Sequence, residues 1–177
     1  ILRPVPPQKV LQGAANLHYL STIVLYVVIH DRDFIDCQYL YMVNRVYNRI
    51  SNTNRFYHKL SPEGENVLAM EITCHFDDNI WKSSDEDLFE KCIVNLESDE
   101  IIGRDEVKQF FSVRVKNAYP FYRLGYNKNL AEIYDHLKQI PNLTLIGRTG
   151  AFKYMDIDQC LEDTAELVKC FKTEKII

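Results

Sequence analysis

The stretch that decides the fold is NLTLIGRTGAFKYMDIDQ, residues 142–159. Its first part is a short apolar run, which predicts a buried strand over residues 142–146 that ends at Gly147. After a loop, Asp156 opens a helix predicted over residues 156–171. In α/β sheets, ligands bind beyond the carboxyl ends of strands, where helix N-termini offer unpaired N–H groups and a partial positive charge. The segment therefore has the layout of a ligand-binding turn, although an ordinary strand–loop–helix connection gives the same pattern.

The sequence just before this segment predicts an amphipathic helix over residues 127–139, which Pro141 ends. Its apolar face contains Leu130, Ile133, Tyr134 and Leu137. From Phe121 onward there are only about fifty residues and one strong strand, too few to form a core of their own. This part is expected to complete a sheet whose other strands lie elsewhere.

The first two thirds of the chain consists mostly of predicted strands. β-branched and aromatic residues predict them over residues 18–30, 38–43, 45–50, 67–73 and 109–115. Helices are expected over residues 8–16 and after Ser84, which has an N-cap pattern with a carboxylate three residues on. The character changes near Tyr119 and Pro120. The sequence therefore predicts an α+β fold in two parts, an antiparallel sheet with helices (residues 1–118) and a strand–helix piece of an α/β layer (residues 119–177).

Composition excludes several classes of function. The net charge is −4 with no basic run, so the electrostatic footprint of nucleic-acid binding is missing. The longest apolar run, residues 23–29, is far too short for a transmembrane segment. Five scattered cysteines without a CxxC pair indicate reduced thiols and a cytoplasmic protein. Cys74 and His75 have no second ligand pair nearby, so no metal site is predicted.

Residues 141–156 resemble the C-terminal FAD-binding segment of amine-oxidase-like flavoproteins, a superfamily that includes protoporphyrinogen-oxidase-like enzymes and UDP-galactopyranose mutases. The resemblance is carried by Pro141-Asn142-Leu143, Leu145-Ile146-Gly147-Arg148 and Tyr154-x-Asp156. The lead-in Ala118-Tyr119-Pro120-Phe121-Tyr122 also resembles that of oxidoreductases in this group. Upstream, Arg49-Ile50-Ser51-Asn52 and Leu60-Ser61-Pro62 stand where related chains carry Arg-x-x-Asn and Ser-Pro.

This resemblance implies a cofactor and a set of contacts. FAD would pass close to the strand-end glycine, and the last helix would point its N-terminus at the pyrimidine edge of the flavin. The implied cofactor-binding residues are Gly147, Arg148, Tyr154, Met155, Asp156 and Ile157. The implied substrate-binding residues are Tyr119, Tyr122, Arg148 and Tyr154. In the mutases, the corresponding Arg and Tyr lie near the flavin and the diphosphate of the substrate.

Simpler interpretations of these residues stay open. Arg148 has the reach for a loop ion pair with Asp156 or Asp158, and the tyrosines are equally suited to packing. Asp156 and Gln159 have the spacing of a capping box, which would use the same N–H groups that a flavin would contact. No catalytic residue is assigned, because the five histidines are dispersed and no hydrolase motif occurs.

The GxGxxG fingerprint that holds the ADP half of FAD does not occur in this sequence. The expected partner is therefore an N-terminal Rossmann portion of the same polypeptide, and the chain alone is expected to bind FAD weakly or not at all and to be inactive. The parent is expected to be an FAD-dependent oxidoreductase acting on a small molecule in a cleft between the two parts. The alternatives are a mutase-like flavoenzyme acting on a nucleotide sugar and a stand-alone, non-enzymatic binding module.

Overall fold

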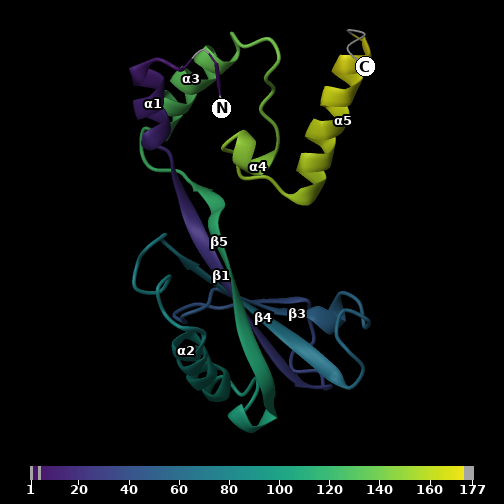
Figure 1. Cartoon of the computed structure of the whole chain (residues 1–177). Coiled ribbons are helices and arrows are strands. Elements are labelled where there is room, and N and C mark those ends of the chain that lie inside the picture. Colours follow the sequence, from purple (N-terminus) through teal and green to yellow (C-terminus); the bar gives the residue numbers. More distant parts are fainter. Residues whose placement is uncertain (1, 4, 174–177) are drawn as a thin grey trace. The chain divides into compact units, whose positions relative to one another are not determined.

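The two longest strands, β1 (His18–His30) and β5 (Val107–Phe121), confirm the strands expected from β-branched and aromatic residues, with β5 longer than predicted. The structure is a computed structural model that describes residues 2–3 and 5–173 (Figure 1). The chain forms two compact units, residues 21–116 and the combination of residues 1–20 with 117–177. The predicted domains 1–118 and 119–177 differ in where they assign the first twenty residues, and parts of both lie outside the described residues. As functional domains they remain a prediction.

The sheet has the strand order β2-β3-β4-β1-β5. The three remaining strands are β2 (Tyr39–Tyr41), β3 (Arg49–Asn52) and β4 (Glu65–Cys74), and β1–β4, β4–β3 and β3–β2 are all antiparallel. The antiparallel α+β part of the prediction is thus confirmed. The predicted strand over residues 38–43 is longer than β2, and the predicted strand over residues 45–50 overlaps β3 only at Arg49 and Ile50. The connection between them turns at Asn44, which adopts a left-handed φ of 61°.

One face of the sheet is closed by helix α2 (Asp85–Ser98), whose start was predicted correctly: the Ser84 hydroxyl accepts a hydrogen bond from the Asp87 N–H at 3.1 Å. Leu88, Cys92 and Leu96 are fully buried against the sheet. The sheet contributes alternate residues of its two central strands to this core, namely Ile23, Leu25, Val27, Leu68, Met70 and Ile72. Each buried aliphatic side chain of this kind contributes about 1.5–3 kcal/mol.

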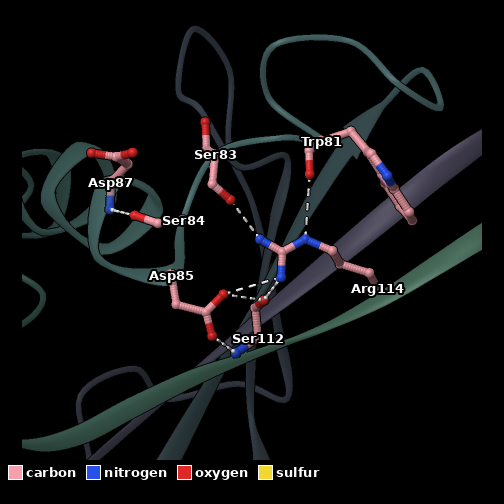
Figure 2. A network of polar contacts seen from close by, with 7 residues as sticks. All are labelled: Trp81, Ser83, Ser84, Asp85, Asp87, Ser112 and Arg114. Atoms are coloured by element: carbon pink, nitrogen blue, oxygen red, sulfur yellow. Dashed lines mark hydrogen bonds and ion pairs between the residues drawn. The ribbon is translucent and has the colours of Figure 1, made fainter.

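A polar network fixes the first turn of α2 to β5 (Figure 2). The Asp85 carboxylate accepts hydrogen bonds from the hydroxyl (2.6 Å) and N–H (2.7 Å) of Ser112 and from Arg114 Nη1 (3.1 Å). Arg114 also donates to the Ser83 carbonyl at 2.7 Å. The Ser112 hydroxyl, helped by Arg114, lowers the pKa of Asp85, so the carboxylate is ionised at neutral pH. Short 3-10 turns η1 (Thr53–Arg55) and η2 (Arg104–Glu106) complete this unit.

The other unit is helical apart from the adjoining ends of β1 and β5. It contains α1 (Gln8–Ala15), α3 (Tyr126–Leu137), the single turn α4 (Gly147–Gly150) and α5 (Ile157–Thr173), so three of the predicted helices are confirmed within a few residues. α1 packs against α3 at Gly13, where an added Cβ would lie 3.5 Å from the Asn129 carbonyl oxygen. No helix within the described residues is long and apolar enough to cross a bilayer.

The strand predicted over residues 142–146 is not found: these residues are irregular, and none of the described strands pairs with them. That they complete a sheet with strands elsewhere in the polypeptide stays a prediction. Leu143 and Leu145 are half-buried, while Asn142, Thr144 and Ile146 are exposed, so the two-residue alternation of a strand is kept. A strand forms only where another strand pairs with it through backbone hydrogen bonds. The local sequence of residues 142–146 does not show whether such a partner is present.

Candidate functional site

The connection from residue 146 to α5 folds into a compact hook. Ile146 is extended, and Gly147 then takes a left-handed φ of 72°, a conformation that favours glycine. A single helical turn follows, closed by hydrogen bonds from the Ala151 N–H to the Gly147 carbonyl (2.9 Å) and from the Lys153 N–H to the Arg148 carbonyl (3.0 Å). The left-handed backbone of Gly147 thus turns the chain, and its predicted contact with FAD stays a prediction. An added Cβ there would meet nothing within 4 Å.

Arg148 ties the two ends of this hook together. Its Nε donates to the Met155 carbonyl at 2.9 Å, and Nη2 donates to the same oxygen. The guanidinium lies over the rings of Tyr119 and Tyr154, 5.2 and 5.0 Å from their centroids. The two rings are themselves stacked at 5.9 Å. Arg148, Tyr119 and Tyr154, which were all predicted to belong to the site, therefore contact one another, and both guanidinium–ring distances are within the range of cation–π interactions.

The ion pair considered for Arg148 is not found: in the described part of the chain, no carboxylate lies within salt-bridge distance of its guanidinium, and Nη1 has no hydrogen-bond partner. Asp156 and Asp158 make no ion pair there either. The arrangement leaves Arg148 with a fixed position and one unused edge. A guanidinium held in this way can bind a carboxylate or phosphate oxygen without first being ordered.

Phe152 packs the hook from beneath. It is only 4% exposed, with a φ of 45°, and its ring contacts those of Tyr19 (5.0 Å), Tyr122 and Tyr126 (both 6.1 Å). The Tyr122 hydroxyl accepts a hydrogen bond from the Tyr154 N–H at 2.6 Å. Tyr122, predicted to bind substrate, thus supports the backbone of Tyr154, and a contact with substrate stays a prediction.

Two further tyrosines hold the hook by donating hydrogen bonds to its carbonyls. The Tyr19 hydroxyl donates to Thr149 at 3.1 Å, and that of Tyr134 donates to Ala151 at 2.7 Å. Burial raises the pKa of both phenols, so both remain protonated donors at neutral pH. Neither residue was predicted to belong to the site, and Tyr134 was expected only on the apolar face of its helix, because nothing in the local sequence marks the carbonyl that each hydroxyl binds.

A groove of about 490 Å³ runs from the hook along the first two turns of α5. Its wall includes four predicted cofactor-binding residues, Arg148, Met155, Asp156 and Ile157. Gly147 and Tyr154 lie next to it in the chain and are not part of the wall. The sequence predictions missed Cys160, Leu161 and Thr164, although with Ile157 they fall at the i, i+3, i+4, i+7 spacing of one helix face.

The first turn of α5 is only half capped. Gln159 Oε1 accepts a hydrogen bond from the Asp156 N–H at 2.9 Å, and the Cys160 N–H bonds to the Asp156 carbonyl at 3.0 Å. The reciprocal half of the predicted capping box is missing, because the Asp156 carboxylate accepts no hydrogen bond from the residues described. The Asp156 side chain therefore leaves the first-turn N–H groups of α5 for another acceptor.

No protein-family model matches this chain, and no curated protein matches it. Several solved structures share its fold, among them the following two. Reduced UDP-galactopyranose mutase is 20% identical with a TM-score of 0.68, over 81% of this chain and 31% of the mutase. A protein from Exiguobacterium sp. 255-15 named after protoporphyrinogen oxidase is 18% identical with a TM-score of 0.68, over 93% of this chain and 37% of that protein.

The chain therefore spans about a third of the length of these two proteins. Identities this low establish a common fold and leave the reaction open. Both names belong to the enzyme groups that residues 141–156 resemble.

Proposed function

We propose that this chain is part of an FAD-dependent oxidoreductase and that the groove beside α5 is its flavin-side wall. The observation that carries the proposal is the composition of that groove: four of the six residues implied by the sequence resemblance meet there, at the half-capped start of a helix. The fold shared with two enzymes of the groups that the sequence resembles supports it.

The groove residues fit a flavin ring in chemistry. Met155, Ile157 and Leu161 give an apolar wall suited to a flat ring, and the first-turn N–H groups suit a ring edge that carries negative charge. FAD, when bound, supplies the two-electron acceptor. The chain positions the ring and stabilises charge on it, while the ADP half is held by a Rossmann portion elsewhere in the polypeptide.

The substrate side of this proposal is the 21–116 unit, whose sheet is covered by α2 on one face only. No side chain of the chain is assigned an acid–base role, because the proposed chemistry requires orientation and electrostatics from the protein rather than a dedicated nucleophile.

A mutase-like reaction on a nucleotide sugar is the second candidate. It is favoured by Arg148, which lies over Tyr119 and Tyr154 with Nη1 unpartnered among the described residues, because a preordered guanidinium suits a diphosphate. The flavin would lie at the same groove in both functions. The two differ in the reaction, which is oxidation of a small molecule in the first and isomerisation of a nucleotide sugar in the second.

A turnover assay on the full-length polypeptide separates the candidates. An oxidoreductase consumes an electron acceptor in proportion to product, whereas a mutase interconverts UDP-galactopyranose and its furanose isomer without one. Arg148→Lys should impair the mutase reaction strongly, because Lys offers a point charge in place of a planar fork. If the coding sequence starts at Ile1 with no GxGxxG upstream, both enzyme proposals fail and a stand-alone binding module remains.

A further inference from the structure

Tyr122 lies in the connection between β5 and α3, and its side chain is held by a hydrogen bond and by two ring contacts. Its hydroxyl accepts the hydrogen bond from the Tyr154 N–H at 2.6 Å. Its ring stacks on that of Tyr126, with centroids 4.6 Å apart and an angle of 21° between the planes, and meets the Phe152 ring edge-on at 6.1 Å. The ring contacts restrict where the hydroxyl can lie, so the acceptor that meets Tyr154 has a defined position.

Tyr154 has little packing of its own. It is 53% exposed, whereas the next residue, Met155, is fully buried. Its N–H is the second of two consecutive N–H groups of the hook that are bound: the Lys153 N–H donates to the Arg148 carbonyl at 3.0 Å, and the Tyr154 N–H donates to Tyr122. The Tyr122 hydroxyl therefore holds the backbone at the point where the hook continues towards α5.

The same short piece of backbone holds the Arg148 guanidinium. Tyr154 supplies the ring whose centroid lies 5.0 Å from Arg148 Cζ, and Met155 supplies the carbonyl that accepts hydrogen bonds from Nε, at 2.9 Å, and from Nη2. Because peptide units are rigid, a rotation of the backbone at Tyr154 moves both the ring and the carbonyl that follows it. Since Arg148 lines the groove beside α5, these contacts link the Tyr122 hydroxyl to the groove.

We propose that Tyr122 is a positioning residue of the groove beside α5: by fixing the Tyr154 backbone, its hydroxyl sets the orientation of the Arg148 guanidinium. The inference rests on the proposed flavoenzyme function and assigns Tyr122 a role that differs from the substrate contact implied by the sequence resemblance. A guanidinium that is already oriented loses little conformational freedom when a ligand binds. The Tyr122 hydroxyl therefore strengthens cofactor binding through Tyr154 and Arg148, without a contact of its own.

A double-mutant cycle on the FAD affinity of the full-length polypeptide tests this role. Tyr122→Phe removes the acceptor and keeps the ring contacts, and it should weaken FAD binding about fivefold. Arg148→Met removes the guanidinium and keeps a long side chain. In the Arg148→Met background, Tyr122→Phe should change the FAD affinity by less than about twofold, because the group that Tyr122 orients is gone.

Tyr126→Phe is the matched control. The Tyr126 ring stacks on that of Tyr122, while its hydroxyl makes no hydrogen bond within the described residues. Loss of this hydroxyl should leave the FAD affinity unchanged, with or without Arg148.

The cycle separates positioning from a general loss of stability, which would weaken FAD binding by the same factor in both backgrounds. Such an equal loss, an unchanged affinity in Tyr122→Phe, or a comparable loss in Tyr126→Phe would overturn the proposal. A full-length wild-type polypeptide that binds no FAD would refute the flavoenzyme function and the positioning role with it. Wild-type FAD binding without coupling between Tyr122 and Arg148 would refute the positioning role alone.

Discussion

Replacing Asp85 by Asn tests whether the network at the start of α2 stabilises the 21–116 unit. The carboxylate accepts three hydrogen bonds, two from Ser112 and one from Arg114. The amide introduced by Asp85→Asn would have one acceptor oxygen in place of two. Its NH₂ group would face one of the donors, Ser112 or Arg114, and could not accept a hydrogen bond from it. Asp87→Asn is the control: it removes the same charge from the same helix turn, and the Asp87 carboxylate has no partner among the described residues (Figure 2).

The magnitude follows from the bonds that are lost. Hydrogen bonds to charged groups are worth about 1.5–3 kcal/mol each. We count two of the three hydrogen bonds as lost in Asp85→Asn, and we lower their energy because Asp85 is partly exposed to solvent. Asp85→Asn is then expected to lower the free energy of unfolding by about 2 kcal/mol more than Asp87→Asn at pH 7. The same bonds lower the pKa of Asp85, so this contribution is full above the ordinary Asp pKa of about 4 and is lost as the pH falls through the lower folded-state pKa.

Urea unfolding followed by tryptophan fluorescence measures the difference, since Trp81 is the sole tryptophan and its carbonyl lies 3.4 Å from Arg114 Nε. The titration is run at pH 7 and again near the acid end of the folded range. Equal midpoints for the two variants at pH 7, or a difference that persists after Asp85 is protonated, would refute the reasoning.

Substitutions at three further positions probe the packing of the sheet unit and of the hook. Tyr47→Phe should be neutral or stabilise by about 1 kcal/mol in urea unfolding, because the buried Tyr47 hydroxyl has no partner among the described residues; a loss above that size would contradict it. Phe152→Ala should speed hydrogen exchange in residues 147–156, with a cost of about 3 kcal/mol, and Phe152→Gly should cost no more, because φ is 45°. Arg148→Lys should lower protection in the same segment by about 1–2 kcal/mol; unchanged exchange would disprove its tethering role.

Sequence reasoning succeeded where local signals decide the structure. Residues 18–30 carry a β-branched, aromatic run with polar ends, and β1 matches it at both limits. Ser84 was recognised as a cap from its spacing to Asp87, and that hydrogen bond is present. Arg148 and Ile157 were predicted to bind the cofactor because they belong to one short, recognisable segment of sequence. Both line the groove beside α5.

It failed where structure depends on distant neighbours. Residues 142–146 have the composition of a buried strand, but pairing requires an adjacent strand that no local pattern can reveal. The contact between Arg148 and Tyr119 spans 29 positions, and the competing ion pair with Asp156 looked equally good by spacing. The hydrogen bond from Ser112 to Asp85 could not be predicted for the same reason. The start of α2 and strand β5 are far apart in the sequence and meet only in the folded unit.

The FAD affinity of the full-length polypeptide tests whether a flavin lies against the start of α5, as proposed. Ile157→Lys places a charged chain in the groove, whereas Val168→Lys makes the same change farther along the same helix, outside the groove. The account predicts one FAD per polypeptide, at least about tenfold weaker binding for Ile157→Lys, and wild-type affinity for Val168→Lys. A full-length polypeptide without FAD, or two variants with equal affinity, would contradict it.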